Sequence, residues 1–136
     1  MADTEPLTRR LDVIPVEECL RLLESRSIGR IAFVDDGRPQ VRPVNYRFHE
    51  GSVVLRTAHG TWLDTVHLAA VAFEVDAIDA DYHTGWSVVV HGKGEEVWRP
   101  EELAEMRRLP LRPWAPGTRE HYVRILPAQI TGRRIT

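Results

Sequence analysis

The 136-residue sequence contains a single cysteine, Cys19, and a single lysine, Lys93. One cysteine excludes an intrachain disulfide and a zinc site built from several thiolates. The formal net charge is -2 and the arginines form no block, so the chain lacks the basic footprint of a nucleic-acid-binding protein or of a polybasic membrane anchor. We therefore expect neither a nucleic-acid nor a membrane partner. Cys19 falls on a helical pattern with Leu20 and Leu23, which predicts a packed, unreactive thiol.

Long apolar runs are also missing. No stretch approaches the roughly 20 apolar residues that cross a bilayer, and the polar residues 1–10 contain no apolar signal region. These absences favour a cytoplasmic protein. Hydrophobic residues nevertheless make up 43% of the chain, which is enough for one globular core. We expect an N-terminal arm over residues 1–11 and a single domain over residues 12–136.

Motifs for metal or hydrolytic chemistry are absent as well. His59 and His67 are too far apart to meet on one helical turn, and His83, His91 and His121 form no short-spaced ligand motif with acidic or cysteine residues. The serines lie in no pattern with a histidine and an acid. The sequence therefore predicts no metal ligands and gives no support to a hydrolase.

What is present is a succession of β-rich runs separated by turn signals. Strands are predicted over 28–34, 40–48, 52–57, 69–75, 86–98 and 121–130, helices over 16–25, 61–68 and 100–109, and irregular segments over 76–85 and 109–117. Gly92 and Gly94 predict a bulge or bend within their strand. The pattern indicates a mainly β domain with a few short helices. It favours a closed antiparallel barrel, with an open sandwich as the alternative.

The most informative segment joins two of these strands. Arg56 and Thr57 end one strand, and Gly60 and Thr61 lead into the predicted helix, for which Thr61 is a candidate N-cap. A guanidinium, a hydroxyl group and a helix N-terminus at one place favour a bound phosphate. The neighbouring strand end, Pro43–Tyr46, offers a mostly apolar edge beside it. This combination suits a phosphorylated planar cofactor, with FMN as the first candidate.

Each of these residues also has a plainer interpretation. Arg56 is compatible with a solvated arginine at a strand end, and Asn45 and Tyr46 with residues that close a hairpin. Trp86 lies in a β-rich run, where an aromatic side chain is often part of the core. Trp114 lies in a proline-rich segment, where it covers a pocket or anchors a loop.

Taken in order, short motifs along the chain resemble those of the pyridoxamine 5'-phosphate oxidase-like superfamily. These motifs are Ile28-Gly29-Arg30-Ile31-Ala32, Pro43-Val44-Asn45-Tyr46, Arg56-Thr57, Gly60-Thr61, Phe73-Glu74-Val75-Asp76 and Gly85-Trp86-Ser87-Val88-Val89-Val90-His91-Gly92. Within this superfamily the chain is most similar to small actinobacterial proteins grouped with nitroimidazole-resistance reductases. The resemblance implies a flavin-binding split β-barrel and a homodimer with the cofactor at the subunit interface.

The resemblance also implies roles for particular residues. Pro43, Val44, Asn45 and Tyr46 would run along the isoalloxazine ring and supply backbone contacts. The phosphate would be held by Arg56, Thr57, Gly60, Thr61, Trp62 and Leu63, and Trp86 and Ser87 would reach the ring from the partner subunit. The family commonly has lysine at the position of Trp62. The loss of that cation leaves Arg56 as the principal charge and leaves open a choice between FMN and the actinobacterial deazaflavin coenzyme. Trp62 itself either stacks on a ring or packs.

The resulting prediction is an FMN-dependent oxidoreductase acting on a small organic substrate. A flavin carries out the electron or hydride chemistry itself, so no catalytic side chain is identified and none is required. The alternatives are a non-catalytic protein that binds or stores a flavin, a deazaflavin or haem, and a barrel without cofactor that acts through its dimer surface.

Overall fold

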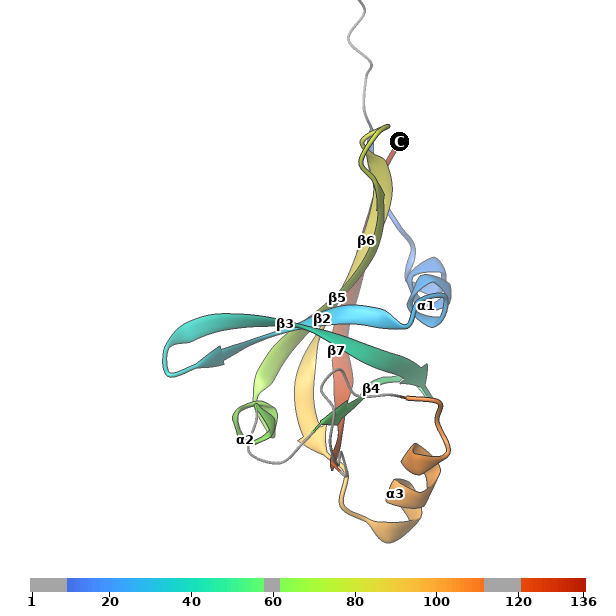
Figure 1. Cartoon of the computed structure of the whole chain (residues 1–136). Coiled ribbons are helices and arrows are strands. Elements are labelled where there is room, and N and C mark those ends of the chain that lie inside the picture. The colour runs from blue at the N-terminus through green and yellow to red at the C-terminus, as the bar shows by residue number, and fades with distance from the viewer. Residues whose placement is uncertain (1–9, 58–61, 112–120) are drawn as a thin grey trace, which may run out of the picture.

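The computed structural model describes residues 10–57, 62–111 and 121–136. Within these residues the strands are β1 (Leu11–Val13), β2 (Ile28–Asp35), β3 (Arg38–His49), β4 (Ser52–Thr57), β5 (Ala70–Asp79), β6 (Thr84–Glu96) and β7 (His121–Ile135) (Figure 1). The helices are α1 (Val16–Glu24), α2 (Leu63–Val66) and α3 (Pro100–Arg107). None of the helices in this part of the chain is long and apolar enough to cross a bilayer.

The described strands close into a ring. Their order is β1-β7-β4-β3-β2-β5-β6, every pair is antiparallel, and β6 returns to pair with β7. Closure removes the open edges that a sandwich would leave, apart from the short strand β1. The predicted closed antiparallel barrel is confirmed, and the sandwich alternative is wrong.

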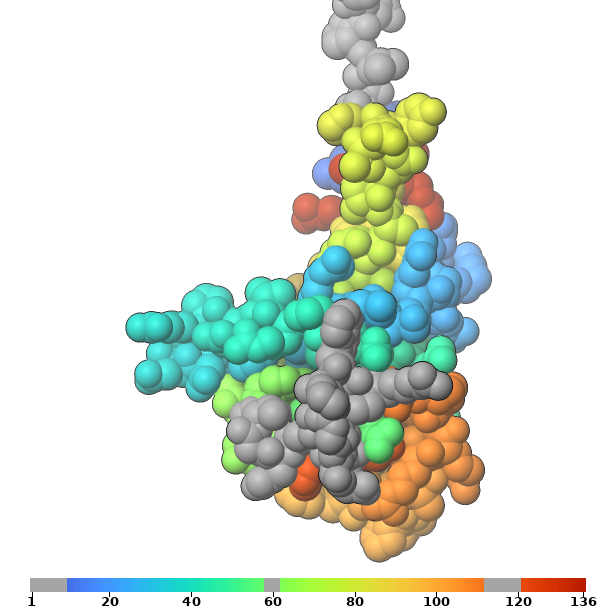
Figure 2. All heavy atoms as spheres, in the orientation of Figure 1, coloured from blue at the N-terminus to red at the C-terminus, as the bar shows by residue number. Residues whose placement is uncertain are grey.

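Two hairpins extend beyond the barrel, β2–β3 to one side and β5–β6 at the end that carries the C-terminus (Figures 1 and 2). The expectation of an irregular segment over 76–85 is wrong, because Asp76 pairs with Ser87 and Asp79 pairs with Thr84 in the β5–β6 ribbon. A ribbon that projects from the barrel keeps much of its surface in solvent, so acidic residues do not prevent strand pairing there. The Asp79 carboxylate accepts hydrogen bonds from the N–H groups of Asp81 and Tyr82 and so shapes the turn.

Other boundaries also differ from the prediction, most clearly at the two ends of the chain and at α2. β7 continues to Ile135 rather than ending at residue 130, and β1, which begins at the last residue of the expected arm, pairs Leu11 with Ile135. Helix α2 covers four residues, fewer than the predicted 61–68. Position 62 is its N-cap, and the predicted cap Thr61 lies outside the described residues. The pairing of β1 depends on the distant strand β7, which local sequence patterns do not reveal.

The predicted irregularity in β6 is confirmed by a register shift between His91 and Gly92, opposite β7. A Cβ atom at Gly92 would overlap the carbonyl group of Leu126, and one at Gly94 would overlap that of Val66. Both glycines therefore allow neighbouring backbone to approach β6 more closely than a side chain would permit.

Two apolar clusters stabilise the structure. The main cluster fills the barrel and extends under α1, where Cys19 and Leu23 are completely buried. Burial raises the pKa of the Cys19 thiol, so the prediction of a packed cysteine is confirmed. A second cluster, on the outer face of β4 and β7, consists of Val54, Val97, Met106, Leu111 and Tyr122. It holds α3 and the residues after it against the barrel.

Candidate functional site

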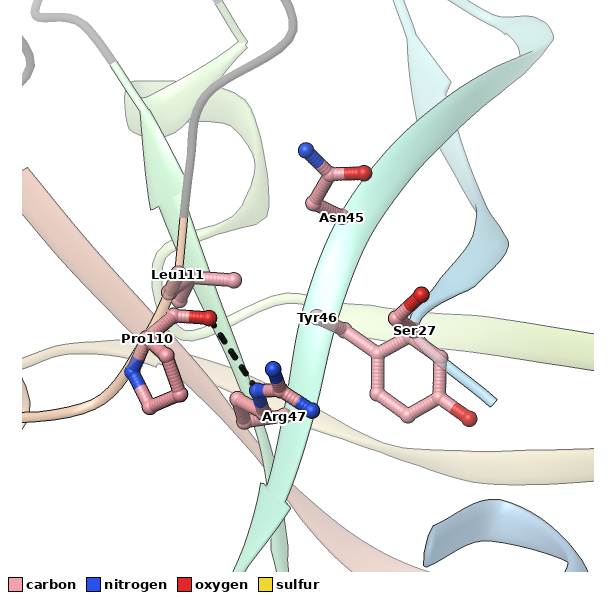
Figure 3. Close-up of a pocket in the computed structure, with 6 residues that line it drawn as sticks. All are labelled: Ser27, Asn45, Tyr46, Arg47, Pro110 and Leu111. Carbon is pink, nitrogen blue, oxygen red and sulfur yellow. Dashed lines mark hydrogen bonds between the residues drawn. The ribbon is translucent and has the colours of Figure 1, made fainter. Parts of the chain in front are cut away.

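A hollow of about 430 Å³ lies beside β3 (Figure 3). It is lined by Ser27, Asn45, Tyr46, Arg47, Pro110 and Leu111. Its volume falls within the roughly 300–1,000 Å³ that is usual for small-molecule sites. Asn45 and Arg47 alternate along β3 with Val44 and Tyr46, whose side chains belong to the buried core. Strand alternation therefore gives β3 an apolar inner face and a polar face beside the hollow.

Tyr46 lines this hollow while its side chain packs in the core. The ring lies on the other side of β3 from Pro110 and Leu111 (Figure 3), with its edge against Phe73 at a centroid distance of 4.8 Å. Its hydroxyl group donates a hydrogen bond to the carbonyl oxygen of Leu23 at 2.5 Å, and burial raises the pKa of the phenol. Tyr46 therefore anchors the strand, and its backbone N–H group donates to the carbonyl oxygen of Ser27 at 2.9 Å.

Arg47 lines the hollow, and Arg56 on the neighbouring strand contacts one of its lining residues. The Nε group of Arg47 donates to the carbonyl oxygen of Pro110 at 3.1 Å, and a terminal nitrogen of Arg56 donates to that of Leu111 at 3.3 Å. Arg56 also lies 5.8 Å from the centroid of the Tyr122 ring. The structure thus brings the predicted residue Arg56 to the polar face of Asn45, where it also has a structural role that the sequence did not indicate.

The rest of the predicted phosphate segment is only partly described. Thr57 is 5% exposed and ends β4, while Gly60 and Thr61 lie outside the described residues and stay predictions. Trp62 packs against Phe33, with 6.0 Å between ring centroids, and Leu63 is buried in the main core. Trp62 thus has a packing contact, and its predicted stacking on a cofactor ring stays a prediction.

Trp86 and Ser87 lie elsewhere on the chain. They line a second hollow of about 300 Å³, together with Leu11, Ile78, Gly85, Arg133 and Ile135. The guanidinium of Arg26 lies 5.8 Å from the centroid of the Trp86 ring, and the next residue, Ser27, lines the first hollow. A single chain therefore divides the predicted cofactor residues between two places.

The sequence interpretation missed four residues of the first hollow: Ser27, Arg47, Pro110 and Leu111. Arg47 had a usable signal, because it lies two positions after Asn45 on the same face of one strand. Pro110 and Leu111 had none, since only the packing of α3 on the second apolar cluster brings them to β3.

Comparison with known proteins places these features in a family. The family model described as pyridoxamine 5'-phosphate oxidase matches residues 15–134. An uncharacterised protein of Mycobacterium tuberculosis is 38% identical over 125 residues, which cover 88% of this chain and 82% of that protein.

Solved structures are similar over almost the whole chain. The FAD-binding protein from Mycobacterium smegmatis is 37% identical, with a TM-score of 0.76 and coverage of 90% of this chain and 95% of that one. A putative pyridoxamine 5'-phosphate oxidase from Corynebacterium glutamicum is 33% identical, with a TM-score of 0.79 and coverage of 93% and 94%.

Proposed function

The chain belongs to the pyridoxamine 5'-phosphate oxidase family, and on this basis we propose that it binds a flavin nucleotide in the hollow beside β3 and acts as a flavin-dependent oxidoreductase. The observation that carries the proposal is a pair of guanidinium groups at a hollow of about 430 Å³: Arg47 lines it, and Arg56 is hydrogen-bonded to Leu111, which also lines it. The similarity to an FAD-binding protein of M. smegmatis supports it.

The residues around the hollow fit a phosphorylated flavin. Guanidinium groups bind phosphate through charge-assisted and often bidentate hydrogen bonds. Asn45 adds an amide group and Ser27 a hydroxyl group to the lining of the hollow, and both suit the polar edge of an isoalloxazine ring. The buried side chains of Val44 and Tyr46 keep the β3 backbone in place beside them.

FMN is the flavin that the sequence predicts, and the M. smegmatis relative adds FAD as an alternative. The deazaflavin coenzyme is the third candidate, because Trp62 replaces the lysine that is common in the family. All three carry phosphate and a planar ring system, so they make the same demand on Arg56. Mass spectrometry of the bound molecule distinguishes them.

The partner subunit supplies the remaining contacts in this proposal. Trp86 and Ser87 line a separate hollow in one chain, so a second chain is needed to bring them to the first. Apolar side chains on the protruding hairpins support a homodimer, since Val34, Val41 and Ile78 are each about 60% exposed. A second copy that covers them removes this apolar surface from water.

When bound, the flavin supplies hydride or electron transfer. The chain's own residues bind the phosphate, orient the ring and exclude water from one of its faces. The proposed substrate is a small organic molecule that reaches the other face of the ring. No side-chain acid or base is assigned to the reaction.

The test is a titration of the apoprotein with FMN and with FAD, in which flavin fluorescence reports binding. We expect Arg56→Ala to weaken binding at least about tenfold, because a hydrogen bond to a charged group contributes about 1.5–3 kcal/mol. Arg56→Lys keeps the positive charge but lacks the planar guanidinium group. We expect its flavin affinity to lie between those of the unchanged protein and Arg56→Ala. Arg21→Ala removes an exposed arginine on α1 and serves as the control. Unchanged affinity in a folded Arg56→Ala protein would contradict the phosphate role.

A second assay addresses turnover. The flavin-loaded protein is mixed with NADH, NADPH or reduced deazaflavin coenzyme, and the flavin absorbance is followed before and after addition of an electron-poor aromatic compound. Reduction followed by reoxidation supports an oxidoreductase. A bound flavin that no donor reduces would mean a binding or storage protein.

A further inference from the structure

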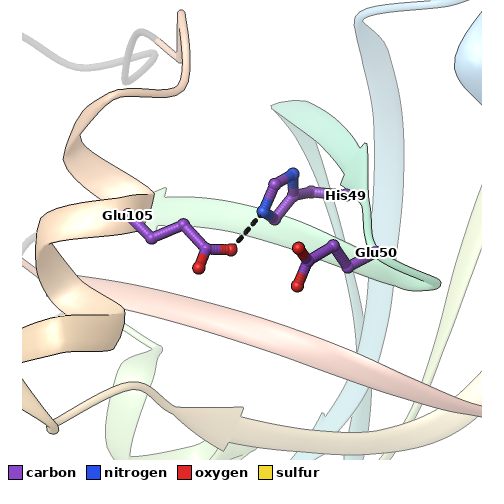
Figure 4. Close-up of side chains that lie close together, drawn as sticks. All are labelled: His49, Glu50 and Glu105. Carbon is purple, nitrogen blue, oxygen red and sulfur yellow. Dashed lines mark hydrogen bonds and ion pairs between the residues drawn. The ribbon is translucent and has the colours of Figure 1, made fainter.

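A second group of polar side chains lies at the far end of β3, outside the flavin hollow (Figure 4). The Nε2 atom of His49 and a carboxylate oxygen of Glu105 are 2.5 Å apart, although 56 positions separate the two residues. The Glu50 side chain points toward the same place from the turn between β3 and β4 (Figure 4). One ligand atom from each of the three lies within 4.8 Å of the others.

We propose that His49, Glu50 and Glu105 form a binding site for a divalent first-row transition metal ion such as Zn²⁺. One imidazole nitrogen and two carboxylate oxygens are ligands of the kinds that Zn²⁺ binds in proteins. Within the described residues, this is the one group of three or more histidine, cysteine, aspartate or glutamate side chains close enough to share an ion.

The distances allow the ion to enter with small side-chain movements. Zinc lies about 2.0–2.2 Å from histidine nitrogen and carboxylate oxygen, so two ligand atoms of a tetrahedral site are about 3.3 Å apart. His49 and Glu105 would open by less than one ångström from their present hydrogen bond. Glu50 is exposed and would move inward about its own side-chain torsions. Three protein ligands leave the fourth position to water.

The surroundings match an ion in both size and charge. The hollow beside these side chains has a volume of about 80 Å³, which holds an ion and a few waters but is well below the roughly 300 Å³ of an organic ligand site. Its lining contains three carboxylates, Glu50, Glu102 and Glu105, against one guanidinium, Arg124. With His49 neutral, the formal charge is two negative units, which a divalent cation neutralises.

Arg124 does not compete with the ion for the proposed ligands. Its guanidinium is held by Glu95 at 2.7 Å and by Glu102 at 2.7 Å, both outside the three-residue cluster. The elements that carry the ligands are also fixed before an ion binds. His49 is the last residue of β3, and Glu105 lies on α3 beside Met106, which is buried in the second apolar cluster. Folding has therefore already ordered β3 and α3, so the binding of an ion costs less conformational entropy.

A bound ion would join β3 to α3. The hydrogen bond from Arg47 to Pro110 already joins β3 to the residues that follow α3. Because an ion that binds only the folded chain raises its stability, the site predicts a metal-dependent increase in melting temperature. The site involves no residue of the flavin hollow. Its test is therefore independent of the proposed flavin function.

The test is calorimetric titration of the untagged protein with Zn²⁺, with Mg²⁺ as the comparison ion. We expect saturable one-to-one binding of Zn²⁺ and much weaker binding of Mg²⁺, which keeps its waters and demands octahedral oxygen ligands. His49→Ala and Glu105→Gln are each expected to weaken Zn²⁺ binding at least about tenfold, since even the loss of an outer partner of a metal ligand costs 10–100-fold. Glu50→Gln is expected to weaken it as well.

Two matched variants provide the controls. Glu101→Gln makes the same change in charge on the same helix, outside the cluster, and His91→Ala removes an exposed histidine of β6. Neither is expected to alter the affinity. Co²⁺ gives a second readout, because its visible absorption bands report the ligands around it and are expected to disappear in His49→Ala. The proposal would be overturned if His49→Ala bound Zn²⁺ with unchanged affinity. It would also be overturned if the heats of the Zn²⁺ titration of the unchanged protein did not saturate. If His49→Ala fails to fold, Glu50→Gln at the exposed turn replaces it in the test. Unchanged Zn²⁺ affinity in Glu50→Gln would then overturn the proposal.

Discussion

Arg47 on β3 donates a hydrogen bond from its Nε group to the carbonyl oxygen of Pro110, 3.1 Å away and 63 positions later in the sequence. Arg56, on the neighbouring strand β4, donates from a terminal guanidinium nitrogen to the carbonyl oxygen of Leu111 at 3.3 Å. The two strands therefore hold two consecutive carbonyl groups that follow α3. This arrangement forms one border of the hollow in which we propose that the flavin binds.

Replacement of Arg47 by alanine tests the importance of this border. Removal of the guanidinium takes away its hydrogen bond to Pro110 and its proposed contact with the phosphate, so we expect the affinity for flavin to weaken at least about tenfold. The measurement is a flavin titration together with a thermal melt of the apoprotein. Affinity equal to that of the unchanged protein, in a variant that still folds, would contradict the proposed role of Arg47 in binding the flavin.

Tyr46 anchors the same strand from inside. Tyr46→Phe removes the hydroxyl group that bonds to the carbonyl oxygen of Leu23, and leaves this buried acceptor without its partner. We expect the free energy of unfolding to fall by about 1–3 kcal/mol. Urea denaturation measures it, with Tyr82→Phe at a 74% exposed position as the control. Equal effects of the two substitutions would mean that the buried hydrogen bond contributes nothing.

The pH dependence of stability follows from Glu74 on β5. Burial is the main cause that raises its pKa from 4.5 to about 7, the nearby carboxyl of Asp76 adds to the effect, and Arg30 at 3.1 Å opposes it. The folded chain thus binds this proton more tightly than the unfolded chain does. Its contribution to stability is complete below pH 4.5 and is lost as the pH rises through about 7.

Glu74→Gln removes this titration while keeping the shape of the side chain. We expect the free energy of unfolding of the variant to fall less than that of the unchanged protein as the pH rises from 4.5 to about 7. Urea unfolding at several pH values measures the difference, and Glu24→Gln at an exposed position of α1 is the control. If the free energies of unfolding of Glu74→Gln and the unchanged protein changed in parallel with pH, Glu74 would have an ordinary pKa.

The proposed homodimer depends on apolar side chains of the protruding hairpins. Ile78→Asp places a charge beside the hollow of Trp86 and Ser87 and is expected to give a monomer in light scattering. Flavin affinity is expected to fall with it, because the partner's contacts would be lost. Val16→Asp, at an exposed position on α1, controls for the added charge. A dimer of unchanged affinity in Ile78→Asp would place the subunit interface elsewhere.

Local patterns predicted most of the strands. The limits of β4 agree with the prediction, and the bulge at Gly92 was expected, because β-rich runs and glycines act within a few residues. The ribbon of β5 and β6 over 76–85 was missed, because its acidic residues resemble a loop and only pairing with each other makes them strands. β1 was missed for the same reason, since its partner is at the other end of the chain.

The site was predictable only in part. Asn45 and Arg56 were identified from two neighbouring strands, whose pairing brings them to one face. Pro110 and Leu111 were not, because the packing of α3 places them there. The approach of His49 to Glu105 depends on the same packing, and no spacing in the sequence indicates it.

The most direct measurement of the central claim is the absorbance spectrum of the freshly purified protein, with mass spectrometry of whatever denaturation releases. The account predicts the two absorbance bands of a flavin and a mass of FMN or FAD close to one per chain. The spectrum of a deazaflavin or of haem would leave the fold assignment intact but would mean that the cofactor, and so the chemistry, differs from the proposal. A colourless protein whose stability does not respond to added FMN, FAD or deazaflavin coenzyme would contradict the claim that the hollow beside β3 is a flavin site.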